Sequence, residues 1–142
     1  MPHLIRQSSD LILEGPIIEV TVVPPRQVIE LLIKEGKPVV TTKAIALIDT
    51  GASCTCIDNT VARSIGLVSH DIKRVLTASG EDMQCLYDAG ILLPTMSTYA
   101  FSVQVLEAKL AKQPYKVLLG RDVLRHCSLI YHGWNHTYTL HL

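Results

Sequence analysis

Apolar residues occur along this chain mainly in short runs of the length and composition typical of β-strands. Residues 17–23 are rich in β-branched side chains, and Pro24-Pro25 ends the run. Residues 39–48 predict one strand or a bent pair of strands, ending in a polar turn. Further strands are predicted at 54–57, 75–78, 83–86, 91–93, 101–106, 116–119, 129–131 and 137–141.

A different periodicity marks residues 26–35 as a helix. Arg26, Glu30 and Lys34 recur four residues apart on one face, while apolar residues fill the other. Helix-forming residues followed by end signals predict two more short helices, at 60–65 and 121–126. The chain is therefore predicted to be all-β, with two or three short helices.

The first fourteen residues show no sustained pattern and are predicted to form a loose arm, with 11–13 as a short edge strand. The tetrapeptide 79–82 predicts a hairpin turn between the strands at 75–78 and 83–86. A second hairpin turn is predicted at 133–135. At 142 residues, the chain fits one domain, 1–142, with a single core.

Charge and hydropathy exclude several classes of protein. The net charge is zero, without the basic excess of a nucleic-acid-binding protein. No apolar run approaches the roughly 18–20 residues that a membrane span needs. Arg6 and Asp10 interrupt any apolar region of a signal peptide. We therefore expect a cytoplasmic protein that binds neither nucleic acid nor membrane.

The cysteines favour reduced thiols over disulfides, because the chain lacks a secretory context. Cys54 and Cys56 are two residues apart, so on a strand they share a face and cannot easily bridge each other. A metal site at Cys127, His132 and His136 is the alternative, but this spacing matches no strong zinc signature. We expect no metal.

One turn combines features that suggest chemistry. The apolar run 44–48 leads directly into Asp49-Thr50-Gly51, followed by Ala52 and Ser53. A carboxylate next to the core is costly unless it is hydrogen-bonded or used. The structural alternative is an Asx-turn, in which Asp49 only caps its own loop.

The flanking residues resemble the active-site loop of aspartic proteases, in which apolar residues precede Asp-Thr-Gly and small residues follow. About 70 residues further on, 117–124 (Val-Leu-Leu-Gly-Arg-Asp-Val-Leu) resembles a second motif of the retropepsin-like members of that family. The order and separation of the two motifs also match. The resemblance implies a single-lobe closed β-barrel, active as a homodimer, that hydrolyses peptide bonds of a peptide or protein substrate without a cofactor.

The number of suitable aspartates supports the dimer. Aspartic-protease chemistry uses two carboxylates that share a proton, because two such close charges cannot both ionise. Only Asp49 is followed by Thr-Gly, whereas the remaining aspartates are Asp10, Asp58, Asp71, Asp82, Asp88 and Asp122. A two-lobed single-chain enzyme is therefore excluded, and a C2 homodimer would bring Asp49 of each chain together.

By resemblance, Asp49 is the catalytic carboxylate and Thr50 hydrogen-bonds across the dimer to the partner's loop. The Gly51 N–H donates to the inner carboxylate oxygen, and a residue without Cβ permits the close approach. Ala52 and Ser53 lie beside the substrate.

The hairpin after the catalytic loop corresponds to the flap of this family, which closes over bound peptide. Its substrate-contacting residues are then Thr77, Ala78, Ser79 and Gly80. An ordinary surface hairpin is the alternative, because this tip has one glycine only. The helix at 26–35 would be an insertion that lies over the substrate cleft or simply covers the sheet.

In the second motif, Gly120 is expected to pack closely behind the catalytic loop. Retroviral enzymes pair the arginine at the position of Arg121 with an acid, but Ser53 occupies that place here. Arg121 is left with Asp58, Asp88 or backbone carbonyls as partners. Alternatively, Arg121 merely begins a helix.

The family dimerises through terminal strands, here the N-terminal arm and the last hairpin, where Tyr131 and Trp134 are candidate anchors. Trp134 could equally cap a surface turn. Two other functions are open: a catalytically silent dimerisation or peptide-binding module of the same fold, and a regulator that uses metal or the thiols.

The resemblance also gives a pH prediction at Ala52, where many relatives have Ser or Thr donating to the outer carboxylate oxygen. Without that donor the charged form has one stabilising hydrogen bond fewer. We expect a pH optimum nearer weak acidity than in Ser-bearing relatives. A pH–rate profile of peptide cleavage measures it, and a bell centred at about pH 3 would contradict the prediction.

Overall fold

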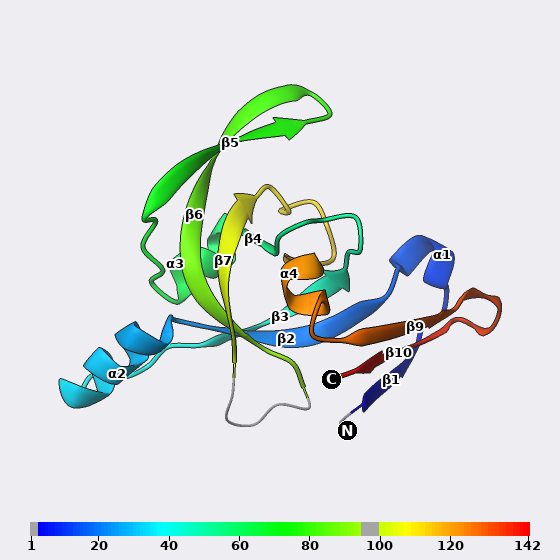
Figure 1. Cartoon of the computed structure of the whole chain (residues 1–142), viewed down its shortest axis with the longest axis horizontal. Helices are drawn as coiled ribbons and strands as arrows, with labels where there is room; N and C mark the ends of the chain where they lie inside the picture. Colours follow the sequence, from blue (N-terminus) through cyan, green and yellow to red (C-terminus); the bar gives the residue numbers. More distant parts are fainter. Residues whose placement is uncertain (1–2, 95–99) are drawn as a thin grey trace.

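The computed structural model describes residues 3–94 and 100–142. Strands dominate it, as predicted (Figure 1). In chain order the elements are β1 (His3–Gln7), α1 (Leu11–Glu14), β2 (Ile17–Val23), α2 (Arg26–Lys34), β3 (Thr42–Ile48), β4 (Cys56–Asp58), α3 (Asn59–Ser64), β5 (Asp71–Thr77), β6 (Gly80–Leu92), β7 (Phe101–Ala108), β8 (Val117–Leu119), α4 (Arg121–Leu124), β9 (Ser128–His132), η1 (Gly133–Asn135) and β10 (Thr137–His141).

Seven strands form a barrel. Their order is β2-β3-β8-β4-β7-β6-β5, and an additional pairing between β2 and β6 closes the sheet. β8 lies between β3, to which it is parallel, and β4, to which it is antiparallel. Fully buried side chains fill the interior, among them Val22, Ile57, Ile91, Val105, Val117 and Leu119. The predicted all-β barrel is confirmed.

The N-terminal segment is ordered, so the prediction of a loose arm was wrong. Strand β1 pairs with β10, which pairs with β9, to form a separate three-stranded sheet. Residues 11–13 belong to a short helix and not to an edge strand. The reason is Asp10, whose carboxylate caps the free N–H groups of Ile12 and Leu13.

The predicted hairpin exists, but its turn is displaced. Thr77 pairs directly with Gly80, so Ala78 and Ser79 form the turn instead of residues 79–82. The strands predicted at 83–86 and 91–93 are one continuous strand, β6, of 13 residues. It pairs with β5 at one end and with β7 and β2 at the other, so one long strand spans the hairpin and the barrel.

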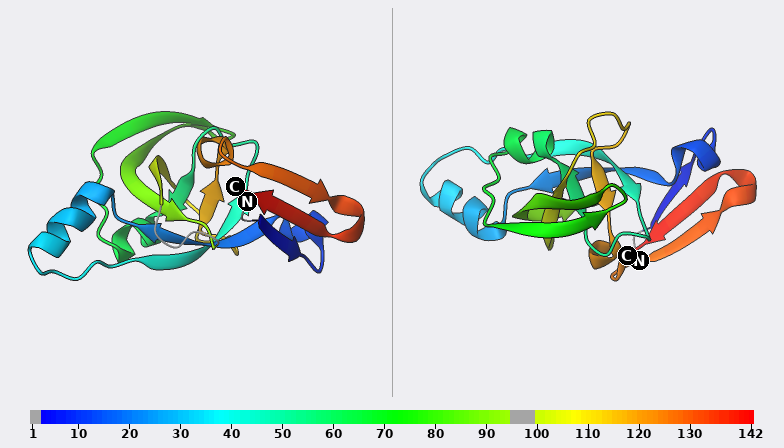
Figure 2. Two further views of the ribbon diagram at one scale, coloured as in Figure 1. Left: turned by 60° about the horizontal axis from the view of Figure 1, so that its bottom comes forward. Right: turned by 90° about the horizontal axis from the view of Figure 1, so that it is seen from above.

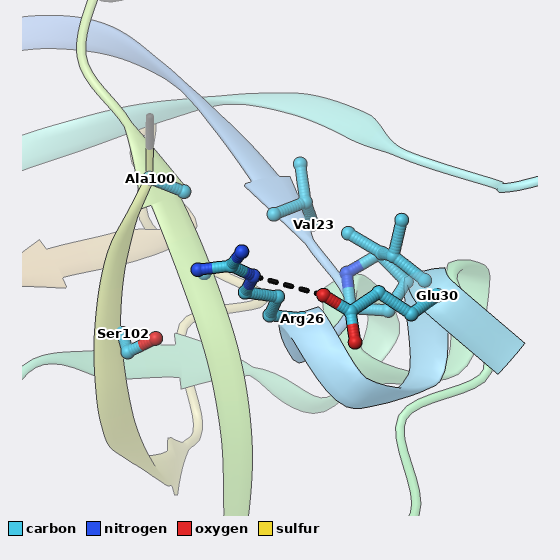
Figure 3. A pocket seen from close by; sticks show the side chains of 8 residues that line it. Val23, Arg26, Glu30, Ala100 and Ser102 are labelled. Atoms are coloured by element: carbon cyan, nitrogen blue, oxygen red, sulfur yellow. Dashed lines mark hydrogen bonds and ion pairs between the residues drawn. The ribbon is translucent and has the colours of Figure 1, made fainter. Parts of the chain in front are cut away.

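The three predicted helices are present as α2, α3 and α4, and α1 is additional. Helix α2 projects from the barrel at the end of β2 (Figure 1). None of its residues is buried, so it does not cover the sheet. A hollow of about 540 Å³ lies beside its first turn, where Arg26 pairs with Glu30 near Val23, Ala100 and Ser102 (Figure 3).

Gly120, at the end of β8, determines how closely β8 and β4 pack. A Cβ at Gly120 would lie 2.4 Å from the carbonyl carbon of Cys54 and 2.5 Å from its oxygen. Both atoms belong to backbone, which cannot move aside as a flexible side chain can. The close packing expected at Gly120 is therefore found in the structure.

We predict that Gly120→Ala lowers the free energy of unfolding by about 3 kcal/mol or more, because the strands must separate. Gly133→Ala is the matched control, since its Cβ would approach only the exposed Tyr131 ring, at 3.2 Å. Urea denaturation of both variants measures the difference. Equal, small losses would show that β8 and β4 are not held in contact.

Asp58 ties helix α3 to the chain before β8. The side chain is 2% exposed and accepts hydrogen bonds from the N–H of Leu110, at 2.9 Å, and from Thr60. Burial alone would raise the pKa of Asp58, but the hydrogen bonds from Thr60 and Leu110 outweigh it and hold the pKa below its ordinary value.

We predict that Asp58→Asn destabilises the fold by about 1–3 kcal/mol at pH 7. Because the folded-state pKa is depressed, the stabilisation is present above the unfolded value of about 3.9 and disappears as pH falls through the folded-state value. Urea denaturation at several pH values from 7 to 3 should therefore show that the difference in the free energy of unfolding between wild type and Asp58→Asn becomes smaller at low pH. The exposed Asp71→Asn serves as control, and a deficit independent of pH would contradict the prediction.

Candidate active site

Asp49 stands at the first residue after β3, at the start of a tight turn. Its N–H donates to the carbonyl of Leu119 at 3.0 Å, which continues the pairing of β3 with β8. The Ala52 N–H donates back to the Asp49 carbonyl at 3.2 Å and closes the turn. The Asp49 side chain is half-buried. The end of a barrel strand thus holds one carboxylate at a partly open position.

Gly51 orients that carboxylate. Its N–H donates to Oδ1 of Asp49 at 2.9 Å, and a Cβ at this position would lie 3.2 Å from the same oxygen. A larger residue would crowd the hydrogen bond. The geometry expected for Gly51 is therefore present, while Thr50, Gly51 and Ser53 are exposed on the outside of the turn.

Two residues that the sequence analysis did not assign to the site support the turn from behind. Asp122 accepts from the N–H of Thr55 at 2.9 Å and from its hydroxyl at 2.7 Å. The Thr55 oxygen in turn accepts from the N–H of Gly120 at 3.1 Å. Thr55 is completely buried. Asp122 lies within the second motif, and Thr55 lies two residues after the first. Their closeness to the motifs is the sequence signal that could have identified them.

Arg121 joins the second motif to the first. Its Nη1 donates to the Thr50 carbonyl at 2.7 Å, and its backbone N–H donates to the Ala52 carbonyl at 2.9 Å. Of the expected partners, the backbone carbonyl is the one found, and Asp58 and Asp88 are engaged elsewhere. Through these two hydrogen bonds Arg121 stabilises the turn that contains Asp49.

The expected substrate-contacting residues of the hairpin lie at its tip. Ala78, Ser79 and Gly80 are exposed at the turn, and Thr77 is the last residue of β5. In Figures 1 and 2 this tip lies on the same side of the barrel as the turn at 49–53. Helix α2 lies at the opposite end, so the structure does not bring it over the turn (Figure 1).

The thiols of Cys56 and Cys127 are not activated nucleophiles. Burial, together with the neighbouring Cys54, raises the pKa of Cys56 to about 12, so this thiol stays protonated at neutral pH. All four cysteines are free, and burial also raises the pKa of Cys127. Within the described residues no three His, Cys, Asp or Glu side chains are placed to hold a metal ion. His136 accepts from the Leu11 N–H.

No helix among the described residues is long and apolar enough to cross a membrane.

Comparisons with known proteins identify the family. The sequence profile described as "gag-polyprotein putative aspartyl protease" matches residues 39–126, which include Asp49-Thr50-Gly51 and Gly120-Arg121. No curated protein sequence matches the chain. Among solved structures, a retropepsin-like aspartic protease from Rickettsia conorii is similar, with 15% identity over 88% of this chain and 91% of that one, and a TM-score of 0.47. The profile spans more than half of the chain and contains both motifs, and the chain therefore belongs to this family of gag-polyprotein aspartyl proteases.

Proposed function

We propose that this chain is an aspartic endopeptidase whose active form is a homodimer with one Asp49 from each subunit at its two-fold axis. The observation that carries the proposal is the turn itself. It presents a single, oriented carboxylate at the open end of a barrel strand, and the family suggests aspartic-type peptidase activity. The pairing of two such turns is the proposed part.

Peptide hydrolysis in this site proceeds through a shared proton. The ionised Asp49 removes a proton from a bound water, whose oxygen attacks the scissile carbonyl carbon. The protonated Asp49 of the other subunit polarises the carbonyl oxygen, and a proton then passes to the leaving nitrogen as the C–N bond breaks. The two titrations belong to the pair of carboxylates and not to one residue.

A second chain must supply the second carboxylate, because the nearby acids within the described part of this chain serve other roles. Asp122 accepts two hydrogen bonds from Thr55, and Asp58 binds Thr60 and Leu110. Asp88 lies 3.3 Å from His70. Across the two-fold axis, the exposed Thr50 then hydrogen-bonds the partner's loop and holds the two carboxylates coplanar.

The substrate in this proposal is an extended peptide, bound in the cleft between the subunits. Ala52 and Ser53 lie beside it on the catalytic turn. The hairpin residues Thr77, Ala78, Ser79 and Gly80 close over it as a flap. Gly120 and Arg121 act as structural residues behind the turn.

We predict that Asp49→Asn abolishes cleavage of a denatured protein or peptide library between about pH 4 and 7, because the dyad loses its ionisable group. Folding is checked by circular dichroism, and Asp71→Asn should retain activity. Cleavage by Asp49→Asn at the wild-type rate would refute the assignment. An inactive wild type that is nevertheless dimeric would favour the silent peptide-binding module.

A mixing experiment tests whether both subunits contribute. Wild-type chain is co-refolded with an equal amount of Asp49→Asn, so that subunits combine at random. If each site needs two Asp49 residues, activity falls to about a quarter of that of the same total amount of wild type. A fall to about one half would show that each chain acts alone.

A further inference from the structure

Helix α1 presents an apolar surface next to the catalytic turn. Ile12 is 87% exposed and Leu13 is 83% exposed, although both are large apolar residues. The helix leads directly into Pro16, whose carbonyl accepts from the N–H of Ile48, the residue before Asp49. The segment that follows this exposed surface is therefore hydrogen-bonded to the strand that ends at the proposed active site.

The apolar surface of α1 is held rigidly. Asp10 caps its first turn, and the Leu11 N–H donates to Nδ1 of His136 at 2.9 Å. The Ser8 N–H donates to the His136 carbonyl at 2.8 Å, which attaches the segment to the turn between β9 and β10. A fixed surface loses little conformational freedom when it is covered.

A complementary hollow of about 370 Å³ adjoins the same catalytic turn. Leu124, Cys127 and Leu129 give it an almost entirely apolar lining, Thr50 borders it, and Arg121 and Arg125 complete it. These two arginines are four residues apart, at the first residue of α4 and at its C-cap, where like charges repel. Neither forms an ion pair with the described residues of its own chain. The lining of the hollow therefore fits a partner that presents apolar side chains together with an acidic group.

Helix α1 carries the matching chemistry. Beside Ile12 and Leu13, the exposed Glu14 accepts hydrogen bonds from the hydroxyls of Ser8 and Ser9 at 2.6 and 2.5 Å. These hydrogen bonds, that of Ser8 foremost, hold the pKa of Glu14 below its ordinary value, so the side chain is charged at neutral pH.

We infer that α1 of each subunit docks into this hollow of the other subunit, with Ile12 and Leu13 against Leu124 and Leu129, and Glu14 facing Arg125. Figure 1 shows α1 and α4 both at the end of β3 that lies far from α2. In the inferred dimer, a two-fold axis at Asp49 places each α1 against the partner's α4. The contact is isologous, so it occurs twice and flanks the shared site on both sides.

The inference rests on the proposed homodimer and adds the surface that holds it together. A second copy is the occupant because both surfaces adjoin the turn that the second copy must approach. Their charges are also opposite.

The apolar part of the contact is tested by Leu13→Asp, which places a charge into the hollow. Ile33→Asp is the matched control, because Ile33 is an equally apolar helical residue, 66% exposed, on α2 far from the turn. Sedimentation equilibrium measures the dimer dissociation constant. We expect Leu13→Asp to raise it roughly tenfold or more and Ile33→Asp to leave it unchanged. Equal effects of the two variants would overturn the inference.

The charged part is tested by a swap. Glu14→Arg and Arg125→Glu alone should each raise the dissociation constant, and the double variant should return it toward wild type because each contact again joins opposite charges. Additive losses in the double variant would overturn the pairing. The Arg125 side chain is exposed, and only its backbone N–H donates, to the Arg121 carbonyl at 2.8 Å, among the interactions of the described residues, so Arg125→Glu remains informative if Glu14→Arg fails to fold.

The outcomes also separate this inference from the proposed function. If the docking is wrong and the function is right, wild-type cleavage depends on Asp49 while Leu13→Asp remains a full dimer. If the function is wrong, wild type does not cleave peptides, whatever the dissociation constants show.

Discussion

A contact between two backbone segments, at Gly120 and Cys54, sets the positions of the turn at 49–53 and of the residues that support it. Because Gly120 has no side chain, the end of β8 packs directly on the chain that leads into β4. The same approach brings Asp122 within hydrogen-bonding distance of Thr55, and Arg121 within reach of the Thr50 carbonyl. The turn at 49–53 is therefore fixed by backbone and buried hydrogen bonds, and no ion pair is needed.

This arrangement separates the carboxylates that support the turn from the carboxylate of Asp49, which we propose to be catalytic. The carboxylates of Asp122 and Asp58 both accept hydrogen bonds, Asp122 from Thr55 and Asp58 from Leu110. Each hydrogen bond joins segments that are distant in sequence. Among the described residues, the Asp49 carboxylate accepts a hydrogen bond from the Gly51 N–H of its own turn, and the side chain remains half-buried. In the proposed mechanism this turn supplies one of two acids. Chemistry and association would consequently be linked, because the proposed docking surfaces border the same turn.

Sequence reasoning located the barrel strands and the helix at 26–35, because their periodicities of two and of about four residues are local. It failed where a contact at long range decides the structure. Residues 3–7 contain no clear strand signal, and they become β1 because β10 offers an open edge. The hairpin turn moved to Ala78-Ser79 because the register of β5 with β6 determined it, and not Gly80. In the site, the motifs identified Asp49, Gly51 and Gly120. They could not identify the partner of Arg121, because every residue has a backbone carbonyl and the sequence does not mark the one at Thr50.

The pairing of β1 with β10 inside one chain has a consequence for how activity is controlled. A subunit whose two ends complete their own sheet has its barrel and terminal sheet formed without help from a neighbour. In the proposed homodimer, folding is a first-order event, whereas bringing a second Asp49 into the site is second-order. Dilution would then leave folded subunits without a complete site, and a high local concentration of chains would favour the proposed activity. Under the proposal, the amount of protein in one place acts as a regulator.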